Sequence, residues 1–188
     1  MTIGLTSVAR TVSAQPVDSF TLRLYLHNHA QIPRPIVSRA EEEVSRVYKQ
    51  VGVTTVWVDG HAALHPAGRD LELMVIINSQ AGDQRPFAGD VMGRAPGSPL
   101  EQGRIAFAFY DPVERFARTY RVDVAVVLGY VMAHEIGHLL LPFGTHSETG
   151  VMRARWDSPQ ARHAIMGRLQ FTPEQAEFIR KKLRMTAS

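Results

Sequence analysis

Apolar positions recur along the chain at two spacings, and each spacing predicts a different element. Residues 20–27 alternate apolar and polar side chains, which is typical of a half-buried β-strand. Residues 36–51 instead carry apolar side chains three and four positions apart, which predicts an amphipathic helix that Gly52 ends. Further strands are predicted at residues 54–58, 71–77 and 104–110, with the second of these in the centre of the sheet.

The C-terminal half is predicted to be helical. Residues 124–141 form a long apolar run with Asp123 as N-cap, and Pro142 and Gly144 predict a sharp turn after it. Asp111 and the proline after it predict a cap for a short helix to about residue 118. Two more helices are expected at residues 158–169 and after Thr172, which starts a capping box.

This order of elements favours an α/β (α+β) fold with a mixed, twisted sheet. The strand–helix–strand start predicts a right-handed crossover, and the long helix is expected to pack on the sheet, followed by C-terminal helices. We expect residues 17–188 to form a single domain, preceded by a flexible tail or signal remnant at residues 1–16. Residues 79–103 form a long connection rich in Gly and Pro, a type of loop that is often functional.

The long apolar helix carries the motif H-E-x-x-H as His134, Glu135 and His138. Positions four apart lie on the same face of a helix, so the two imidazoles are expected to share one metal ion. Zinc suits such a site, because neutral imidazole nitrogens are among its usual ligands. Glu135 need not bind the metal and can instead take a proton from a water molecule on it.

Composition limits the kind of metal site and the surroundings of the protein. The chain has 188 residues, 45% of them apolar, and no cysteine, which excludes disulfides and thiolate ligands. The net charge of +3 and the absence of a dense basic run do not indicate a nucleic-acid surface. The run 124–141 contains three polar site residues that are costly in lipid, so no membrane span is predicted.

The N-terminus leaves the location of the protein open. Residues 1–14 are mildly apolar and end in small residues, as the end of an export signal would, but Arg10 interrupts the stretch. One interpretation is a secreted or periplasmic protein, and the other is a frayed tail on a cytoplasmic one. The oligomeric state is not indicated.

A catalytic zinc ion takes three protein ligands, so a third must come from outside the helix. His146 is the first candidate, because it follows the predicted turn at Gly144. Glu148 is the second, and Glu174 or Glu177 in the last helix are further alternatives.

One stretch of the chain resembles the active-site segment of the metzincin branch of zinc metallopeptidases: H-E-I-G-H-L-L-L-P-F-G-T-H-S-E-T-G-V-M. In that branch, H-E-x-x-H-x-x-G-x-x-H precedes a methionine-containing turn. The gap from His138 to His146 is two residues longer here, and the chain is also similar to compact bacterial zincin-like proteins. The resemblance implies zinc held by His134, His138 and His146, Glu135 as general base, and Met152 beneath the metal. It also implies that the strand at 104–110 is the edge along which a peptide substrate lies.

We therefore expect a zinc-dependent peptidase that acts on peptides or proteins, with the substrate pocket built by residues 144–157 and 79–103. Tyr110 and Tyr130 are candidates for an extra hydrogen-bond donor to the reacting carbonyl. Two alternatives stay open. One is a zinc protein without catalysis, and the other is a zinc hydrolase of a non-peptide substrate, although small zinc endoribonucleases with a related motif lack the residue equivalent to Glu135.

Overall fold

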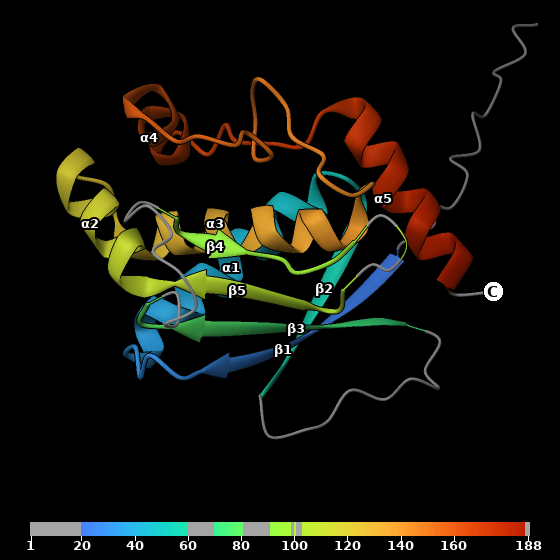
Figure 1. The fold of residues 1–188 in the computed structure, drawn as a ribbon, viewed down its shortest axis with the longest axis horizontal. Coiled ribbons are helices and arrows are strands. Elements are labelled where there is room, and N and C mark those ends of the chain that lie inside the picture. Colours follow the sequence, from blue (N-terminus) through green and yellow to red (C-terminus); the bar gives the residue numbers. More distant parts are fainter. Residues whose placement is uncertain (1–19, 60–69, 81–90, 99, 101–102, 187–188) are drawn as a thin grey trace, which may run out of the picture.

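A computed structural model describes residues 20–59, 70–80, 91–98, 100 and 103–186. Within this part of the chain, five strands form one mixed sheet in the order β2-β1-β3-β5-β4 (Figure 1). All neighbouring strands are parallel except β4, which runs antiparallel to β5. The strands are β1 (Phe20–Asn28), β2 (Val53–Asp59), β3 (Leu71–Asn78), β4 (Gly93–Arg94) and β5 (Ile105–Phe109).

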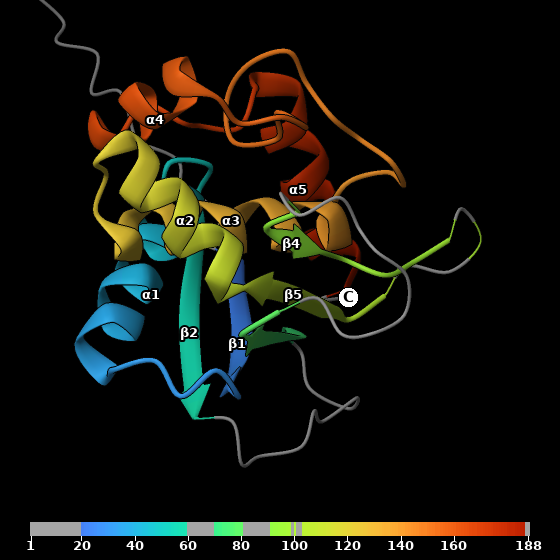
Figure 2. The same ribbon diagram turned by 60° about the vertical axis from the view of Figure 1, so that its left-hand side comes forward.

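Helices cover one face of this sheet. Figures 1 and 2 show α1 and α3 lying against the same face, with α2, α4 and α5 around α3. In β1, Leu22, Leu24 and Leu26 are buried in the core, as their alternation predicts. The helices are α1 (Arg34–Lys49), α2 (Tyr110–Tyr120), α3 (Val124–Leu140), α4 (Ser158–Ile165) and α5 (Pro173–Thr186).

The predicted α/β architecture is confirmed, with β3 in the centre of the sheet and a mixed strand order. The expected tail at residues 1–16 and much of the connection at 79–103 lie outside the described residues. No helix in the described ranges has both the length and the apolar character needed to cross a bilayer.

Helix α3 begins and ends where the sequence predicts. The Asp123 side chain caps it by accepting a hydrogen bond from the Ala125 amide at 2.9 Å. Pro142 follows its last turn, and Gly144 then adopts φ +73°, a conformation that glycine tolerates. The capping box at the start of α5 is also present, because Thr172 and Gln175 each donate a backbone N–H to the side chain of the other.

A glycine lets α1 and α3 pack closely. A Cβ built on Gly129 would lie 2.5 Å from the Cβ of Glu43 and 2.8 Å from the carbonyl oxygen of Ala40. Side chains larger than hydrogen are therefore excluded at this crossing. The close contact packs α3, which carries the H-E-x-x-H residues, directly against α1.

Three predictions about local structure are wrong. Helix α2 begins at Tyr110 directly after β5, so Asp111 does not cap it and instead accepts a hydrogen bond from Gln80 at 3.0 Å. Helix α4 ends at Ile165 and not near residue 169, because Gly167 turns the chain with φ +66°. The strand predicted at residues 104–110 is not the sheet edge, since β4 pairs along its outer side.

Candidate metal centre

Three histidines come together on one side of α3. His134 and His138 stand one turn apart on this helix, and His146 returns to them after the turn at Gly144. One ring nitrogen of each lies within 4.8 Å of the other two. The ring centroids are 4.7 Å apart for His134 and His138, and 5.6 Å and 4.8 Å from these to His146. Such a group has the size to hold one metal ion.

The backbone orients the first of these rings. His134 is buried, and its Nδ1 lies 2.8 Å from the carbonyl oxygen of Val151, to which it donates a hydrogen bond in the tautomer that leaves Nε2 unprotonated. That Nε2 lies 3.0 Å from the Nε2 of His138. Two imidazole ligands of one tetrahedral zinc ion stand about 3.3 Å apart, so these nitrogens are close to that arrangement. Hydrogen bonds of this kind, donated by a ring N–H to a carbonyl oxygen, typically fix the ring of a metal ligand.

The segment after α3 is closed by its own hydrogen bonds. The Ser147 amide donates to the carbonyl oxygen of Met152 at 3.0 Å, and the Val151 amide donates to Gln170 at 3.0 Å. Gly150 has φ +78°, and a Cβ there would clash with the carbonyl oxygen of Gln170. His146 lies at the start of this folded turn and the Val151 carbonyl near its end. The turn therefore places both groups beside α3.

The electrostatic state of the histidines suits metal binding. Burial lowers the pKa of His134 to about 4, with a further contribution from His146. Burial, together with repulsion from His134 and His146, lowers the pKa of His138 to about 3. Both imidazoles are therefore neutral at pH 7, which is the state that binds a metal.

Glu135 lies beside this cluster at the bottom of the site. It is 7% exposed, and burial raises the pKa of its carboxyl to about 8, because a carboxylate loses solvation there. A bound divalent cation would oppose this effect and favour the carboxylate. The carboxyl packs against β4: a Cβ built on Gly93 would lie 2.5 Å from Glu135 Oε1. Only glycine lets the edge strand approach so closely.

Met152 forms an apolar contact beneath α3. It is fully buried, and a Cβ built on Gly137 would lie 2.5 Å from its sulfur and 3.1 Å from the ring of Phe171. Gly137 lies between the two helical histidines in the sequence. The methionine side chain therefore packs against the turn of α3 that carries the imidazoles.

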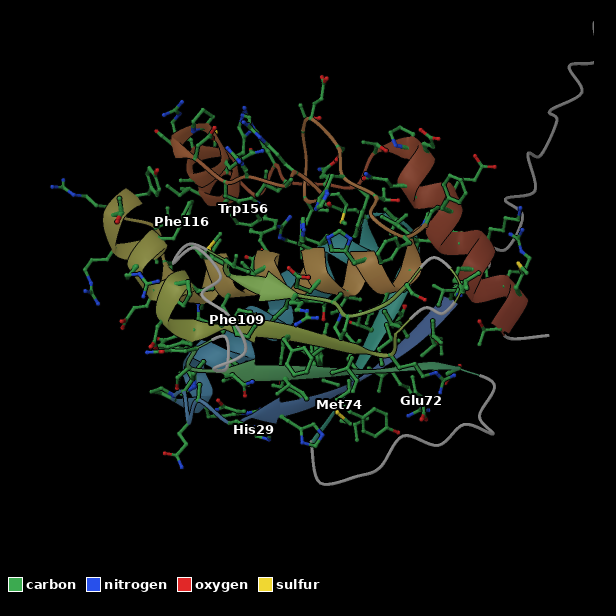
Figure 3. All side chains as sticks on the ribbon, in the orientation of Figure 1. His29, Glu72, Met74, Phe109, Phe116 and Trp156 are labelled. Carbon is green, nitrogen blue, oxygen red and sulfur yellow. The ribbon has the colours of Figure 1, made fainter. Side chains whose placement is uncertain are left out.

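A cleft of about 1080 Å³ opens onto these groups. Both segments predicted to build the pocket contribute to it, through residues 91–97 and 103 on one side and 144, 146 and 153–156 on the other. Phe116 on α2 and Trp156 pack edge to face at one end, with ring centroids 6.0 Å apart (Figure 3). His134, Glu135, His138 and His146 all line the cleft.

Other predicted site residues lie elsewhere. Among the described residues, Glu148, Glu174 and Glu177 are not part of the metal-binding group. The Tyr130 hydroxyl accepts a hydrogen bond from Arg46, and neither Tyr130 nor Tyr110 lines the cleft. The expectation that either tyrosine donates to a reacting carbonyl is therefore not supported by their positions.

Sequence reasoning did not find Gly93 or the Val151 carbonyl. Gly93 lies in a Gly- and Pro-rich connection with no strand pattern, and the Val151 contact involves only its backbone. The aromatic pair of Phe116 and Trp156 could have been suspected only from the closeness of Trp156 to Met152 in the chain.

Comparison with solved structures shows the same overall fold in two archaeal proteins. A zinc-dependent peptidase from Methanocorpusculum labreanum aligns over 86% of this chain and 99% of its own, with a TM-score of 0.51 and 17% sequence identity. Archaemetzincin from Methanopyrus kandleri aligns over 92% of this chain and 99% of its own, with a TM-score of 0.51 and 18% identity. No protein-family model and no curated protein sequence matches this chain.

Proposed function

We propose that the protein is a zinc-dependent peptidase in which His134, His138 and His146 hold the metal and Glu135 is the general base. The observation that carries this proposal is the placement of three imidazoles and one buried carboxyl in the lining of a single cleft. The similarity in fold to a zinc-dependent peptidase and to an archaemetzincin supports it. Met152, buried against α3, takes the part of the methionine in the metzincin turn.

The donor set fits zinc. Three nitrogen ligands without thiolates are typical of catalytic zinc sites, which keep a further position for water or substrate. When bound, zinc supplies Lewis acidity, which polarises a scissile carbonyl and makes a water molecule more acidic. His134 would bind through Nε2, because its Nδ1 is engaged with the Val151 carbonyl.

Glu135 carries the proton transfers in this proposal. Its carboxyl lies within the cleft lining and beside the imidazoles, where it can accept a proton from the attacking water. The same carboxyl then gives the proton to the leaving amine, which must be protonated to depart at neutral pH. Its burial keeps competing water away and holds the carboxyl in one place.

The substrate would bind along β4. Among the described strands, β4 has a neighbour on one side only, through the pairs Gly93 with Ala108 and Arg94 with Phe107. Gly93 and Arg94 both line the cleft. An extended peptide that hydrogen-bonds to the outer side of β4 would pass directly over Glu135, because Gly93 contacts that side chain.

The test is Glu135→Ala, with Glu148→Ala as the matched control. Glu148 is exposed and outside the metal-binding group. We expect Glu135→Ala to bind zinc as wild type does but to lose about 10² to 10⁴-fold in kcat on peptides chosen from a library digest. The control should keep both properties. Full activity in Glu135→Ala would refute the general base, and a zinc-loaded wild type that cleaves no library peptide would indicate a zinc protein without peptidase activity.

A further inference from the structure

The cleft has a strong positive bias that the chain as a whole lacks. Four arginines line it, and Glu135 is the only acidic residue among its described lining residues. The whole chain has a net charge of only +3. The arginines come from three parts of the fold: Arg94 from β4, Arg115 from α2, and Arg153 and Arg155 from the segment before α4.

Arg153 and Arg155 differ in their contacts within the protein. Arg153 forms an ion pair with Asp157 at 3.0 Å, and Asp157 also caps α4. Arg155, two residues before Asp157, is exposed and forms no ion pair with any residue that the structure describes. Its guanidinium is therefore available to a ligand in the cleft.

Two arginines belong to the same end of the cleft. Phe116 and Trp156 pack edge to face there (Figure 3). The ring centroid of Trp156 also lies 6.2 Å from that of Tyr130 in α3. These contacts fix the segment before α4 against α2 and α3. Arg115 and Arg155 immediately precede Phe116 and Trp156 in the chain, so both are carried to this end by the aromatic contact.

From this arrangement we infer that the cleft selects peptides with a carboxylate near the scissile bond, on the side toward α2. The inference rests on the proposed peptidase function and names its substrate class. A guanidinium binds a carboxylate through two parallel hydrogen bonds, and a cleft lined by charge of one sign concentrates the opposite charge. A lysine or arginine on the peptide would be repelled by the same groups.

A peptide fits this cleft better than a nucleic acid does. The edge strand β4 offers main-chain groups to an extended peptide beside the metal-binding group. A nucleic acid would need basic residues beyond the cleft to follow its backbone, and the weak net charge does not indicate them. The carboxylate can belong to an Asp or Glu side chain or to the C-terminus of the peptide, and the experiment below separates these sources.

The experiment measures peptide binding to full-length Glu135→Gln protein, with and without zinc. Fluorescent peptides of one sequence carry Glu, Gln or Lys at the position after the cleavage site, each with a free or an amidated C-terminus. By fluorescence anisotropy, the Glu peptide should bind about tenfold more tightly than the Gln peptide at about 50 mM salt. At about 500 mM salt the affinities of the two peptides should differ by no more than about twofold, because salt screens the charges. The preference should persist without zinc, since it arises from the arginines.

The variants locate the effect. Arg115→Gln combined with Arg155→Gln should reduce the preference to about twofold or less. The control is Arg118→Gln, which removes the same charge from α2 outside the cleft, where Arg118 pairs with Glu114 at 2.9 Å. It should keep the full preference. Circular dichroism of each variant shows that the fold is retained.

The inference would be overturned if the Glu and Gln peptides bound equally and if, in addition, the free and amidated C-termini bound equally. If peptides with a free C-terminus bind more tightly than amidated ones whether they carry Glu or Gln, the carboxylate recognised is the terminal one. The inference would also be overturned if a single-stranded oligonucleotide bound more tightly than the Glu peptide and lost that affinity in the Arg115→Gln, Arg155→Gln double variant. That result would indicate a nucleic-acid ligand. Cleavage of the same peptides by the wild-type protein is measured separately. Cleavage of the peptides without a binding preference for Glu refutes only the inference. A binding preference for Glu without any cleavage refutes only the peptidase function.

Discussion

The contact between Gly93 and Glu135 makes a test of how closely the edge strand must approach the general base. Gly93→Ala adds one methyl group, whose carbon would lie 2.5 Å, 2.6 Å and 2.8 Å from Oε1, Cγ and Cδ of Glu135. Ordinary van der Waals contact begins near 3.4 Å. The carboxyl therefore has to retreat by about 0.9 Å.

The cost of this shift falls on activity more than on stability. The clashing atoms are at the end of a flexible side chain, so Glu135 can rotate while the backbone stays in place. A rotation of this size costs about 0.5–1.5 kcal/mol in rotamer energy. By contrast, a displacement of about 1 Å in a catalytic group can reduce the rate about 10²-fold.

Gly93→Ala should therefore lose about 10²-fold in kcat on an internally quenched peptide while the free energy of unfolding in urea falls by no more than about 1.5 kcal/mol. Zinc content should equal that of wild type, because the three atoms nearest to the added methyl all belong to Glu135 and not to a histidine. A variant with kcat within twofold of wild type would show that the Glu135 carboxyl need not occupy the position described here.

Substitutions at three further residues test other parts of the structure. Met152→Ala should lower the free energy of unfolding in urea by about 2–5 kcal/mol and Met152→Leu by less than about 1.5 kcal/mol, since the side chain is fully buried; equal small losses would argue against tight packing there. Tyr130→Phe should cost about 1–3 kcal/mol by removing one hydrogen-bond partner of Arg46, which also binds Glu43, and should leave kcat unchanged, whereas a large loss of kcat would place the hydroxyl in catalysis. Asp123→Ala should lower the thermal stability of the protein by about 0.5–2 kcal/mol through loss of the α3 cap, and an unchanged melting temperature would contradict that cap.

The elements of the fold that could be predicted are those with a local physical signature. The alternation in β1 and the apolar run of α3 reflect burial of each residue, and Asp123 and Pro142 act on the helix ends next to them. The H-E-x-x-H spacing likewise depends only on helix geometry, so the pairing of His134 and His138 follows from the sequence.

The features that could not be predicted depend on contacts between distant segments. Strand β4 has two residues and no apolar alternation, and it exists because β5 leaves an edge beside α3. Its presence is the reason that the predicted edge strand was misplaced. His146 is the first candidate from the sequence because it follows the turn at Gly144, and it belongs to the group of three histidines. The turn between Ser147 and Met152 that closes this segment has no local sequence pattern.

The central claim is that three histidines from α3 and the following turn hold one zinc ion. The most direct measurement is calorimetric titration of metal-free protein with zinc, compared between wild type and His146→Ala. The account predicts one zinc ion per wild-type chain and a loss of affinity of at least about tenfold in the variant, because a ligand is removed from a set of three. A wild type that binds no zinc, or a variant that binds it as tightly as wild type does, would contradict the account.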